Sequence, residues 1–417
     1  MISSVPTTRT SSSSSCSSAS QSSAPLSNST VYRILSFCPY YPPHVGGLEK
    51  STEELHQLFV NYGHRVTIFT SAIPSPTTAS LSTSNLSVIH YPAFDIIFGY
   101  PVPKFWTITF WRDWHSLFNT PYDIVLSSTR FFLSSLLALI FARMKQLPHL
   151  HIEHGSDYVQ TDNKIVSLLA RLYDETIGRF VLRHSTCNIS PSRSAQHFVY
   201  RFDSRPSPIV YRGVNASLID NIPSSTPFSL KAEQLLLVFA GRLIDAKGIP
   251  DLIQACSRLP RSRYRLAIIG AGPMQPLLTS QVSRLNLTSN IHFLGQLSHH
   301  KTISILKSAD VCINPSYNEG LPTILLEAGL AGCALVASNV GGTSEIISHQ
   351  YSGLLYQPGD NKALNACLSL LLEKPLLRQH LASTAKNSII RRFNWSTTYS
   401  HYLNLFHQYI THDPAKT

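Results

Sequence analysis

The residues best suited to chemistry are two carboxylates, Glu319 and Glu327, which lie eight positions apart. Between them a Gly-Leu-Pro turn leads into an apolar segment that begins at Thr323 and predicts a helix. The free amide groups at a helix N-terminus bind anions, and phosphate is the usual one. Carboxylates do not grip phosphate, but they accept hydrogen bonds from sugar or ribose hydroxyls. The pattern therefore predicts a ligand with both kinds of group, as in a nucleotide sugar.

A pair of cations, Arg242 and Lys247, follows an apolar run at residues 235–240 that predicts a strand. Loops after the carboxyl ends of parallel strands form the ligand-binding edge of such sheets. A guanidinium and an ammonium there can neutralise a diphosphate leaving group as its charge grows, although a solvated basic loop is the alternative. No Asp-x-Asp pair occurs in the chain. We therefore expect a reaction without metal or other cofactor, with a nucleotide-diphosphate sugar as the donor substrate.

Together these motifs resemble the donor-binding signature of the family 4 retaining glycosyltransferases, which have the two-domain GT-B fold. The Glu-Gly-Leu-Pro turn, the Gly-Arg-x4-Lys-Gly spacing and the later sequence Gly341-Gly342-Thr343 carry the resemblance. It implies that Glu319 contacts the donor sugar, that Glu327 contacts the ribose, and that the reaction retains the anomeric configuration.

The same resemblance implies further site residues. His154, after the predicted strand 149–153, matches a cleft histidine near the sugar and the acceptor. Gly46 and Gly47 form a loop that faces the diphosphate, and the segment from Gly295 to Leu297 meets the nucleobase. The expected catalytic residues are Glu319, His154, Arg242 and Lys247. The expected substrate-binding residues are Gly46, Gly47, Gly295, Leu297, Gly320, Leu321, Pro322 and Glu327.

The elements that position these residues predict an α/β fold with two Rossmann-like doubly wound domains that face each other across a cleft. A strand at Tyr32 to Phe37, a glycine-containing loop, a helix and a strand at Arg65 to Thr70 open the first domain. The predicted boundaries are a serine-rich disordered tail (1–30), an N-terminal acceptor domain (31–220), a linker (221–231), a C-terminal donor-binding domain (232–393) and a last helix that crosses back to the first domain (394–417).

Composition fits an enzyme of this kind. The chain has 417 residues, 43% of them hydrophobic and 14% charged, and its net charge is +11. A basic surface suits a diphosphate and could touch an anionic membrane, but no module for nucleic acid accompanies it. The seven cysteines are scattered without metal-ligand spacing. They predict buried reduced thiols and a cytoplasmic protein.

Two segments leave alternatives open. Residues 1–30 are serine-rich and carry no acidic residue, which predicts disorder, with a plastid targeting peptide as the alternative. Residues 94–118 are dense in aromatic side chains, which form either core and loop or a peripheral membrane contact.

The donor sugar, the base and the acceptor stay open, because lipid-linked, polysaccharide and small-molecule acceptors all fit. Two other functions are weighed against glycosyl transfer: a GT-B nucleotide-sugar epimerase and a non-catalytic nucleotide-sugar-binding protein. The sequence also departs from the family in the stretch 210–215, where Arg212 and Asn215 leave no carboxylate.

Overall fold

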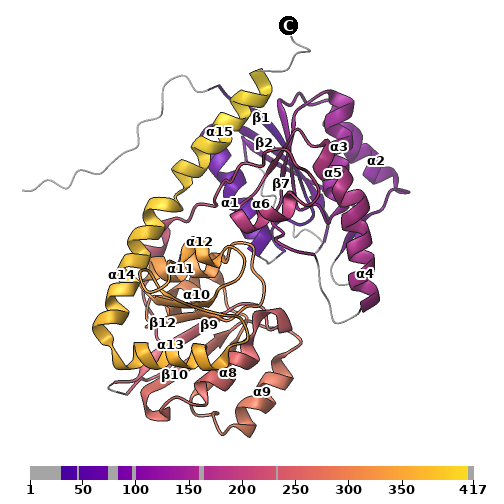
Figure 1. Ribbon diagram of the computed structural model, residues 1–417. Helices are drawn as coiled ribbons and strands as arrows, with labels where there is room; N and C mark the ends of the chain where they lie inside the picture. Colours follow the sequence, from indigo (N-terminus) through magenta and orange to yellow (C-terminus); the bar gives the residue numbers. More distant parts are fainter. Residues whose placement is uncertain are drawn as a thin grey trace, which may run out of the picture. The chain divides into compact units, whose positions relative to one another are not determined.

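The computed structural model describes residues 30–44, 47–73, 83–95, 100–158, 164–231 and 233–411. Residues Tyr32–Thr417 belong to one compact unit. Its framework consists of two six-stranded sheets in which every strand pair is parallel. The predicted α/β fold with two Rossmann-like domains is confirmed (Figure 1).

The first sheet has the order β3-β2-β1-β6-β7-β8. Its strands are β1 (Arg33–Cys38), β2 (Arg65–Ser71), β3 (Leu86–Tyr91), β6 (Ile124–Ser128), β7 (His149–Ile152) and β8 (Cys187–Ile189). The accompanying elements are α1 (Gly47–Asn61), the hairpin of β4 (Ala93–Asp95) and β5 (Pro101–Pro103), α2 (Ile108–Phe118), α3 (Leu133–Lys145), α4 (Lys164–Tyr173), α5 (Arg179–His184) and α6 (Arg193–Val199).

The second sheet has the matching order β11-β10-β9-β12-β13-β14. Its strands are β9 (Leu235–Ala240), β10 (Tyr264–Ile269), β11 (Ile291–Gly295), β12 (Val311–Asn314), β13 (Ala334–Ser338) and β14 (Leu354–Tyr356). The helices from α7 onward are α7 (Ala216–Asp220), α8 (Ile249–Cys256), α9 (Gln275–Arg284), α10 (His299–Leu306), α11 (Thr323–Ala331), α12 (Thr343–Ile346), α13 (Asn361–Glu373), α14 (Pro375–Arg392) and α15 (Trp395–Thr411).

In both sheets the direction in which the chain adds new strands reverses at the centre, and this reversal determines where a ligand can bind. In the second sheet the chain winds outward from β9 to β11 and then starts again beside β9 with β12, where Val311 pairs with Leu237. The loops after β9 and β12 therefore leave neighbouring strands toward opposite faces. Such a switch point opens a crevice at the carboxyl edge of the sheet.

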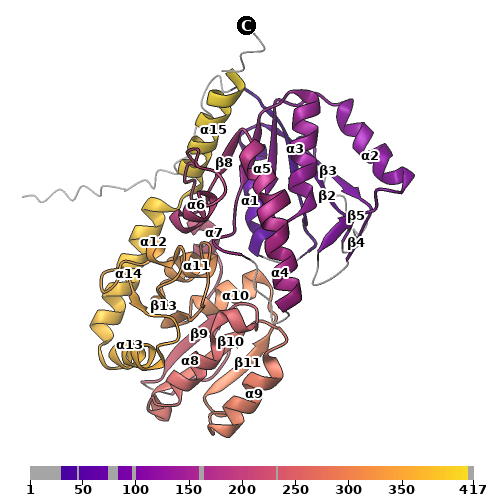
Figure 2. The same ribbon diagram turned by 45° about the vertical axis from the view of Figure 1, so that its right-hand side comes forward.

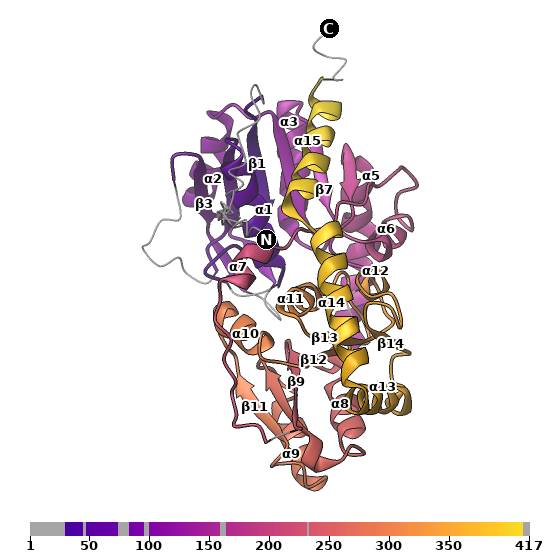
Figure 3. The same ribbon diagram turned by 90° about the vertical axis from the view of Figure 1, so that its left-hand side faces the viewer.

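Apolar cores cover each face of each sheet. In the first domain α2 and α3 pack on one face, whereas α1 and α15 pack on the other (Figure 2). In the second domain α8, α9 and α13 cover one face, and α10, α11 and α14 cover the other (Figure 3). Large aliphatic side chains that leave water in this way supply about 1.5–3 kcal/mol each, so the faces hold the helices firmly.

The last helix binds the first domain although it follows the second in sequence. Tyr399, Tyr402 and Phe406 of α15 lie in the same core as β1 and β2. The rings of Tyr62 and Tyr399 stack with centroids 3.6 Å apart. The imidazole of His64 accepts the Tyr32 N–H at Nδ1 over 3.2 Å, so its Nε2 carries the hydrogen and faces the Tyr399 hydroxyl at 3.0 Å.

Three local patterns of the sequence predict elements that the structure modifies. Residues 166–182 have the amphipathic pattern of one helix, but a π-helical turn at Asp174–Gly178 interrupts it. Pro322 suits the first turn of a helix, but it occupies the capping position before α11. Residues 351–355 predict a strand, which lies at Leu354–Tyr356 because Tyr351 and Ser352 belong to a turn. Periodicity places such boundaries only loosely.

The aromatic segment 94–118 divides between core and surface. Phe110 and Trp114 of α2 are buried, whereas Trp106 and Ile108 are exposed. Residues 96–99 lie outside the described part of the chain. Among the described residues, every helix is too short or too polar to traverse a lipid bilayer.

We predict that mild acid weakens the protein through His64. Burial lowers the pKa of His64 to about 4, whereas an unfolded histidine titrates near about 6.5. Between these values only the unfolded state takes up the proton, so stability falls by about 1.4 kcal/mol per pH unit as the pH decreases. Urea unfolding at several pH values should show a shallower decline in His64→Gln than in wild type.

The matched control is the exposed His380, whose replacement in His380→Gln should leave the pH dependence unchanged. An identical decline in wild type and His64→Gln would mean that His64 is not the neutral link between α15 and the first sheet.

Candidate functional site

Glu319 and Lys247 meet at the switch point of the second sheet. Glu319 follows β12, and Lys247 ends a short 3-10 turn after β9. The Lys247 Nζ lies 2.6 Å from the Glu319 Oε1. Ser316 Oγ and Asn314 Nδ2 donate to the same oxygen over 2.6 and 3.1 Å. The other carboxylate oxygen accepts no hydrogen bond from any residue that the structure describes, and so a ligand hydroxyl can reach it.

Glycines hold the Glu319 loop against its neighbours. Gly341 has φ +49°, and a Cβ there would lie 1.6 Å from the Glu319 carbonyl oxygen. The Gly342 amide donates to the Gly320 carbonyl over 2.9 Å. Gly248 has φ +61°, and a Cβ there would lie 2.1 Å from the Pro315 carbonyl oxygen. Only glycine permits both the backbone conformation and the close approach at Gly341 and Gly248.

The N-terminus of α11 opens beside this loop. The amides of Gly320, Leu321 and Thr323 donate to no backbone acceptor within the described residues. Unpaired amides at a helix start carry partial positive charge that suits an anion. Glu327 lies farther along α11, where its Oε1 is 2.9 Å from His299 Nε2. The hydrogen bond with Glu327 is the main reason why the pKa of His299 is raised above its ordinary value.

Among the described residues, Arg242 is the expected site cation that has no ion-pair partner. It lies in the loop between β9 and the turn that ends at Lys247, and its side chain is exposed. It makes no ion pair with a described residue, in contrast to Lys247. The loop itself is anchored, because the Leu243 amide donates to the Ala271 carbonyl over 2.9 Å.

The first domain contributes the loop that contains His154. A Cβ on Gly320 would lie 2.7 Å from the His154 carbonyl oxygen, so the two loops touch through their backbones. Ser156 Oγ donates to the Glu319 carbonyl and to Asn318 Oδ1, each over 3.1 Å. Burial lowers the pKa of His154 to about 4, and the imidazole is therefore neutral near pH 7.

The remaining expected residues lie near the same edge or outside the description. Gly46 falls outside the described residues, whereas Gly47 is exposed and begins α1. Gly295 ends β11 with φ +69° and open space at the position of a Cβ. Leu297 is half-buried and packs against the core under α10 and α11. Its side chain is therefore part of the core, and its backbone is the part that a nucleobase could contact.

The two departures from the family pattern have structural roles here. Arg212 is 7% exposed, and its Nη2 lies 2.7 Å from Glu54 Oε2 of α1. Asn215 caps α7, where its side chain accepts the amide of Leu218. The positive charge of Arg212 also lowers the pKa of His154, although burial and the charges of Glu153 and His151 have larger effects.

Several residues of the site are missing from the expectations drawn from sequence. Asn314, Ser316 and His299 hold the two carboxylates, and Ser156 joins the loops of the two domains. The polar residues at the end of the strand at 311–314 and directly after it were a signal for the first two. His299 gave none, because nothing in its neighbourhood in the sequence points to Glu327.

Glu345 forms a second contact between the domains. Its carboxylate accepts the Arg193 amide at the start of α6 over 2.8 and 2.9 Å, and the Tyr211 hydroxyl over 2.7 Å. Glu345 belongs to α12, which follows Gly341 and Gly342 directly. The same short segment therefore shapes the Glu319 loop and fastens the second domain to the first.

Known proteins match the chain along most of its length. A family model for glycosyl transferases group 1 matches residues 224–388, and one for Glycosyltransferase Family 4 matches residues 45–218. An uncharacterized glycosyltransferase of Methanocaldococcus jannaschii is 32% identical over 91% of this chain and 99% of its own length. A D-inositol 3-phosphate glycosyltransferase of Frankia alni is 27% identical over 85% of this chain and 92% of its own length.

Solved structures show the same fold. The sucrose-phosphate synthase from Thermosynechococcus elongatus has a TM-score of 0.72 at 19% identity, over 90% of this chain and 98% of the other. An Anabaena protein in complex with UDP-glucose has a TM-score of 0.71 at 18% identity, over 90% of this chain and 100% of the other. These similarities confirm the GT-B arrangement.

We predict that Gly341→Ala disrupts the Glu319 loop. The new methyl group would collide with the Glu319 carbonyl, in addition to a left-handed backbone that costs about 1–2 kcal/mol in other residues. The free energy of unfolding in urea should fall by about 3 kcal/mol. The control is Gly332→Ala, since Gly332 has φ +97° but no atom within 4 Å of a Cβ. Equal losses in both variants would show that the close approach is unimportant.

Proposed function

Because the chain belongs to the glycosyl transferases group 1 family and is a glycosyltransferase, we propose that it moves a sugar from a nucleotide-diphosphate donor to an acceptor hydroxyl. The proposal includes retention of the anomeric configuration and needs no metal ion or other cofactor. The observation that carries it is the 2.6 Å pair of Lys247 and Glu319 at the switch point of the second sheet. An ammonium and a carboxylate side by side suit a ligand that joins phosphate to hydroxyl groups.

The leaving diphosphate is the group that most needs stabilisation. In this proposal Lys247 and the exposed Arg242 provide the positive charge, and the unpaired amides before α11 provide hydrogen bonds. Donors held in place before the reaction stabilise developing charge without reorganisation. Glu319 accepts hydroxyls of the sugar through its free oxygen, while Glu327 accepts those of the ribose.

The loop that contains His154 meets this group of residues from the first domain. Its low pKa keeps the imidazole neutral, so it adds no charge beside the diphosphate and can still exchange hydrogen bonds with sugar or acceptor hydroxyls. We propose this role for His154 because its loop touches Gly320 through the backbone. In this proposal the neutral His154 belongs to the first domain and the charged groups belong to the second.

The names of similar proteins suggest where to begin with substrates. An Anabaena protein of the same fold was solved with UDP-glucose, which makes UDP-glucose a suitable first donor to test. A relative is named for D-inositol 3-phosphate, a small polyol. We propose a nucleotide-sugar donor and a glycan, lipid-linked or small-molecule acceptor, in a reducing compartment such as the cytoplasm. The buried free thiols Cys38, Cys187, Cys256, Cys312 and Cys333 are compatible with that compartment.

We predict that Lys247→Ala and Arg242→Ala each lower turnover by about a hundredfold, as expected when one stabilising group is lost at a developing charge. Release of UDP from UDP-glucose, with and without acceptors, measures the rate. Addition of a chelator should leave the rate unchanged. Product analysis separates transfer from epimerisation of the nucleotide sugar.

The matched control is Arg284→Ala, which removes an exposed cation at the end of α9. Wild-type rates in both site variants would refute the diphosphate assignment. Complete loss of activity with the chelator would refute the metal-free mechanism.

Contact with a membrane is proposed for the surface at the start of α2. Trp106, Ile108 and Trp111 expose apolar surface beside the exposed Arg112. Aromatic side chains next to a cation suit the interface of an anionic bilayer. Such contact would bring the enzyme to a lipid-linked acceptor.

We predict that the protein sediments with vesicles that contain anionic lipid, and that the double variant Trp106→Ser with Ile108→Ser loses about tenfold in this affinity. Leu376→Ser, at an exposed apolar residue of α14, is the control. Equal affinity of all three proteins for the vesicles would contradict this contact.

A further inference from the structure

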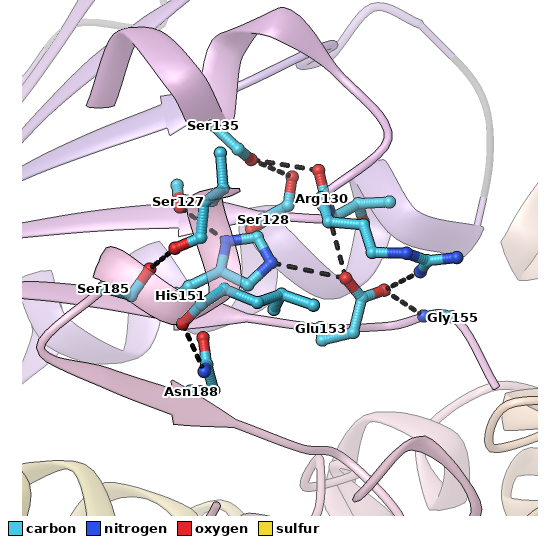
Figure 4. A network of polar contacts seen from close by, with 12 residues as sticks. Ser127, Ser128, Arg130, Ser135, His151, Glu153, Gly155, Ser185 and Asn188 are labelled. Atoms are coloured by element: carbon cyan, nitrogen blue, oxygen red, sulfur yellow. Dashed lines mark hydrogen bonds and ion pairs between the residues drawn. The ribbon is translucent and has the colours of Figure 1, made fainter. Parts of the chain in front are cut away.

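A buried group of charges lies directly beneath the loop that contains His154. Arg130 is 1% exposed, although arginine is almost never fully buried unless it is paired. Its Nη1 lies 2.9 Å from Glu153 Oε1, and its Nη2 lies 2.8 Å from Asp174 Oδ2. Figure 4 shows Arg130 and His151 converging on Glu153, and Glu153 reaching Gly155. In the described part of the chain, no hydrogen bond or ion pair joins Arg130, His151, Glu153 or Asp174 to the proposed donor-binding residues of the second domain.

The contacts of Arg130 grip both ends of the short segment that contains His154. On the side before His154, the Glu153 carboxylate accepts the Arg130 amide over 3.0 Å and the Gly155 amide over 2.6 Å. On the side after it, Arg130 Nη2 donates to the Asp157 carbonyl over 3.3 Å. A guanidinium has several donors in a fixed plane, so it can hold both ends at once, which an ammonium cannot.

Packing around the guanidinium leaves little freedom. Its Cζ lies 4.2 Å from the centre of the Phe198 ring. A Cβ on Gly155 would lie 2.7 Å from Arg130 Nη1 and 2.9 Å from Glu153 Oε1. A side chain at position 155 would collide with these two groups. Glycine is thus required if the Glu153 carboxylate is to accept the Gly155 amide with Arg130 packed close by.

Charge alone does not explain this arrangement. Burial would raise the pKa of Glu153, but Arg130 and His151 lower it to about 2. Burial raises the pKa of Asp174 to about 6, in opposition to Arg130. The Oδ1 of Asp174 has no partner among the described residues. Buried ion pairs are often no more stabilising than apolar side chains, and geometric specificity is one reason to keep them.

We propose that Arg130 is a positioning residue for the reaction, which acts through Glu153 and the Gly155 amide to hold the His154 loop against the Glu319 loop. This proposal rests on the role given to His154 in the proposed function. The loop it holds includes the His154 carbonyl that abuts Gly320 and the Ser156 hydroxyl that donates to the Glu319 carbonyl. Arg130 thereby determines where the His154 loop meets the Glu319 loop.

The test compares Arg130→Lys with Arg205→Lys. The first variant keeps the charge but loses the planar fork. Arg205 is a matched control in the same domain, since it also binds a carboxylate, Asp203, over 2.8 Å and two backbone carbonyls. Amide hydrogen exchange, the melting temperature and the affinity for UDP are measured for both.

We expect Arg130→Lys to speed exchange at the Gly155 amide by about tenfold or more while exchange in β1 and β6 stays at the level of the control. Affinity for UDP should change by less than about twofold, because the other domain holds the nucleotide. NMR titration should show the His154 imidazole protonating at higher pH, as the loop becomes more open to water. The kcat for UDP-glucose hydrolysis should fall by about tenfold more than in the control.

Exchange at Gly155 that is no faster than in Arg205→Lys, or that rises equally throughout the first domain, would overturn the proposal. If Arg130→Lys fails to fold, Asp174→Asn is used, because it weakens the grip on Arg130 Nη2 and leaves the fork in place. The exchange and titration results need no substrate. Wild-type protein that hydrolyses no nucleotide sugar would therefore count against the proposed function and leave the test of the loop intact.

Discussion

The arrangement of the site depends on one contact, between the Lys247 ammonium and the Glu319 carboxylate. These groups attract each other, yet the proposed function assigns each of them to a different part of a nucleotide sugar. The parallel pairing of β9 with β12 brings their loops together, and glycines at 248 and 341 allow the backbones to approach closely enough. Ser316 and Asn314 bind the same carboxylate oxygen as Lys247. The protein thus satisfies one oxygen internally and leaves the other for the ligand.

A division between the domains follows from this contact. The second domain holds both cations, both carboxylates and the helix amides, which are the groups that the proposed function assigns to the nucleotide. The first domain offers a neutral His154, whose loop touches the Glu319 loop through the backbone. Ser156 and Glu345 connect the domains on two sides of the Glu319 loop. The proposed catalysis therefore depends on contacts between the domains, whereas the proposed nucleotide site lies within the second domain.

Sequence revealed the parts of this site that lie within one loop or one helix turn. Glu319, Lys247 and the glycine pair at 341 and 342 were found because short motifs encode their backbone geometry. Arg130 and His299 were missed, since each meets its partner more than twenty positions away in sequence. The two doubly wound domains were implied by alternation of strands and helices, but the π-helical turn at Asp174–Gly178 was not. It depends on tertiary packing that periodicity does not report.

The π-helical turn at Asp174–Gly178 shows how a residue far away in the sequence can shape a loop at the edge of a sheet. Ile152 at the end of β7 still pairs with β6 and β8, but beyond Glu153 the chain leaves the sheet. The π-helical turn carries Asp174 to Arg130, and Arg130 carries that constraint to Glu153 and Gly155. Buried charge with fixed directions supplies the rigidity that the sheet no longer gives.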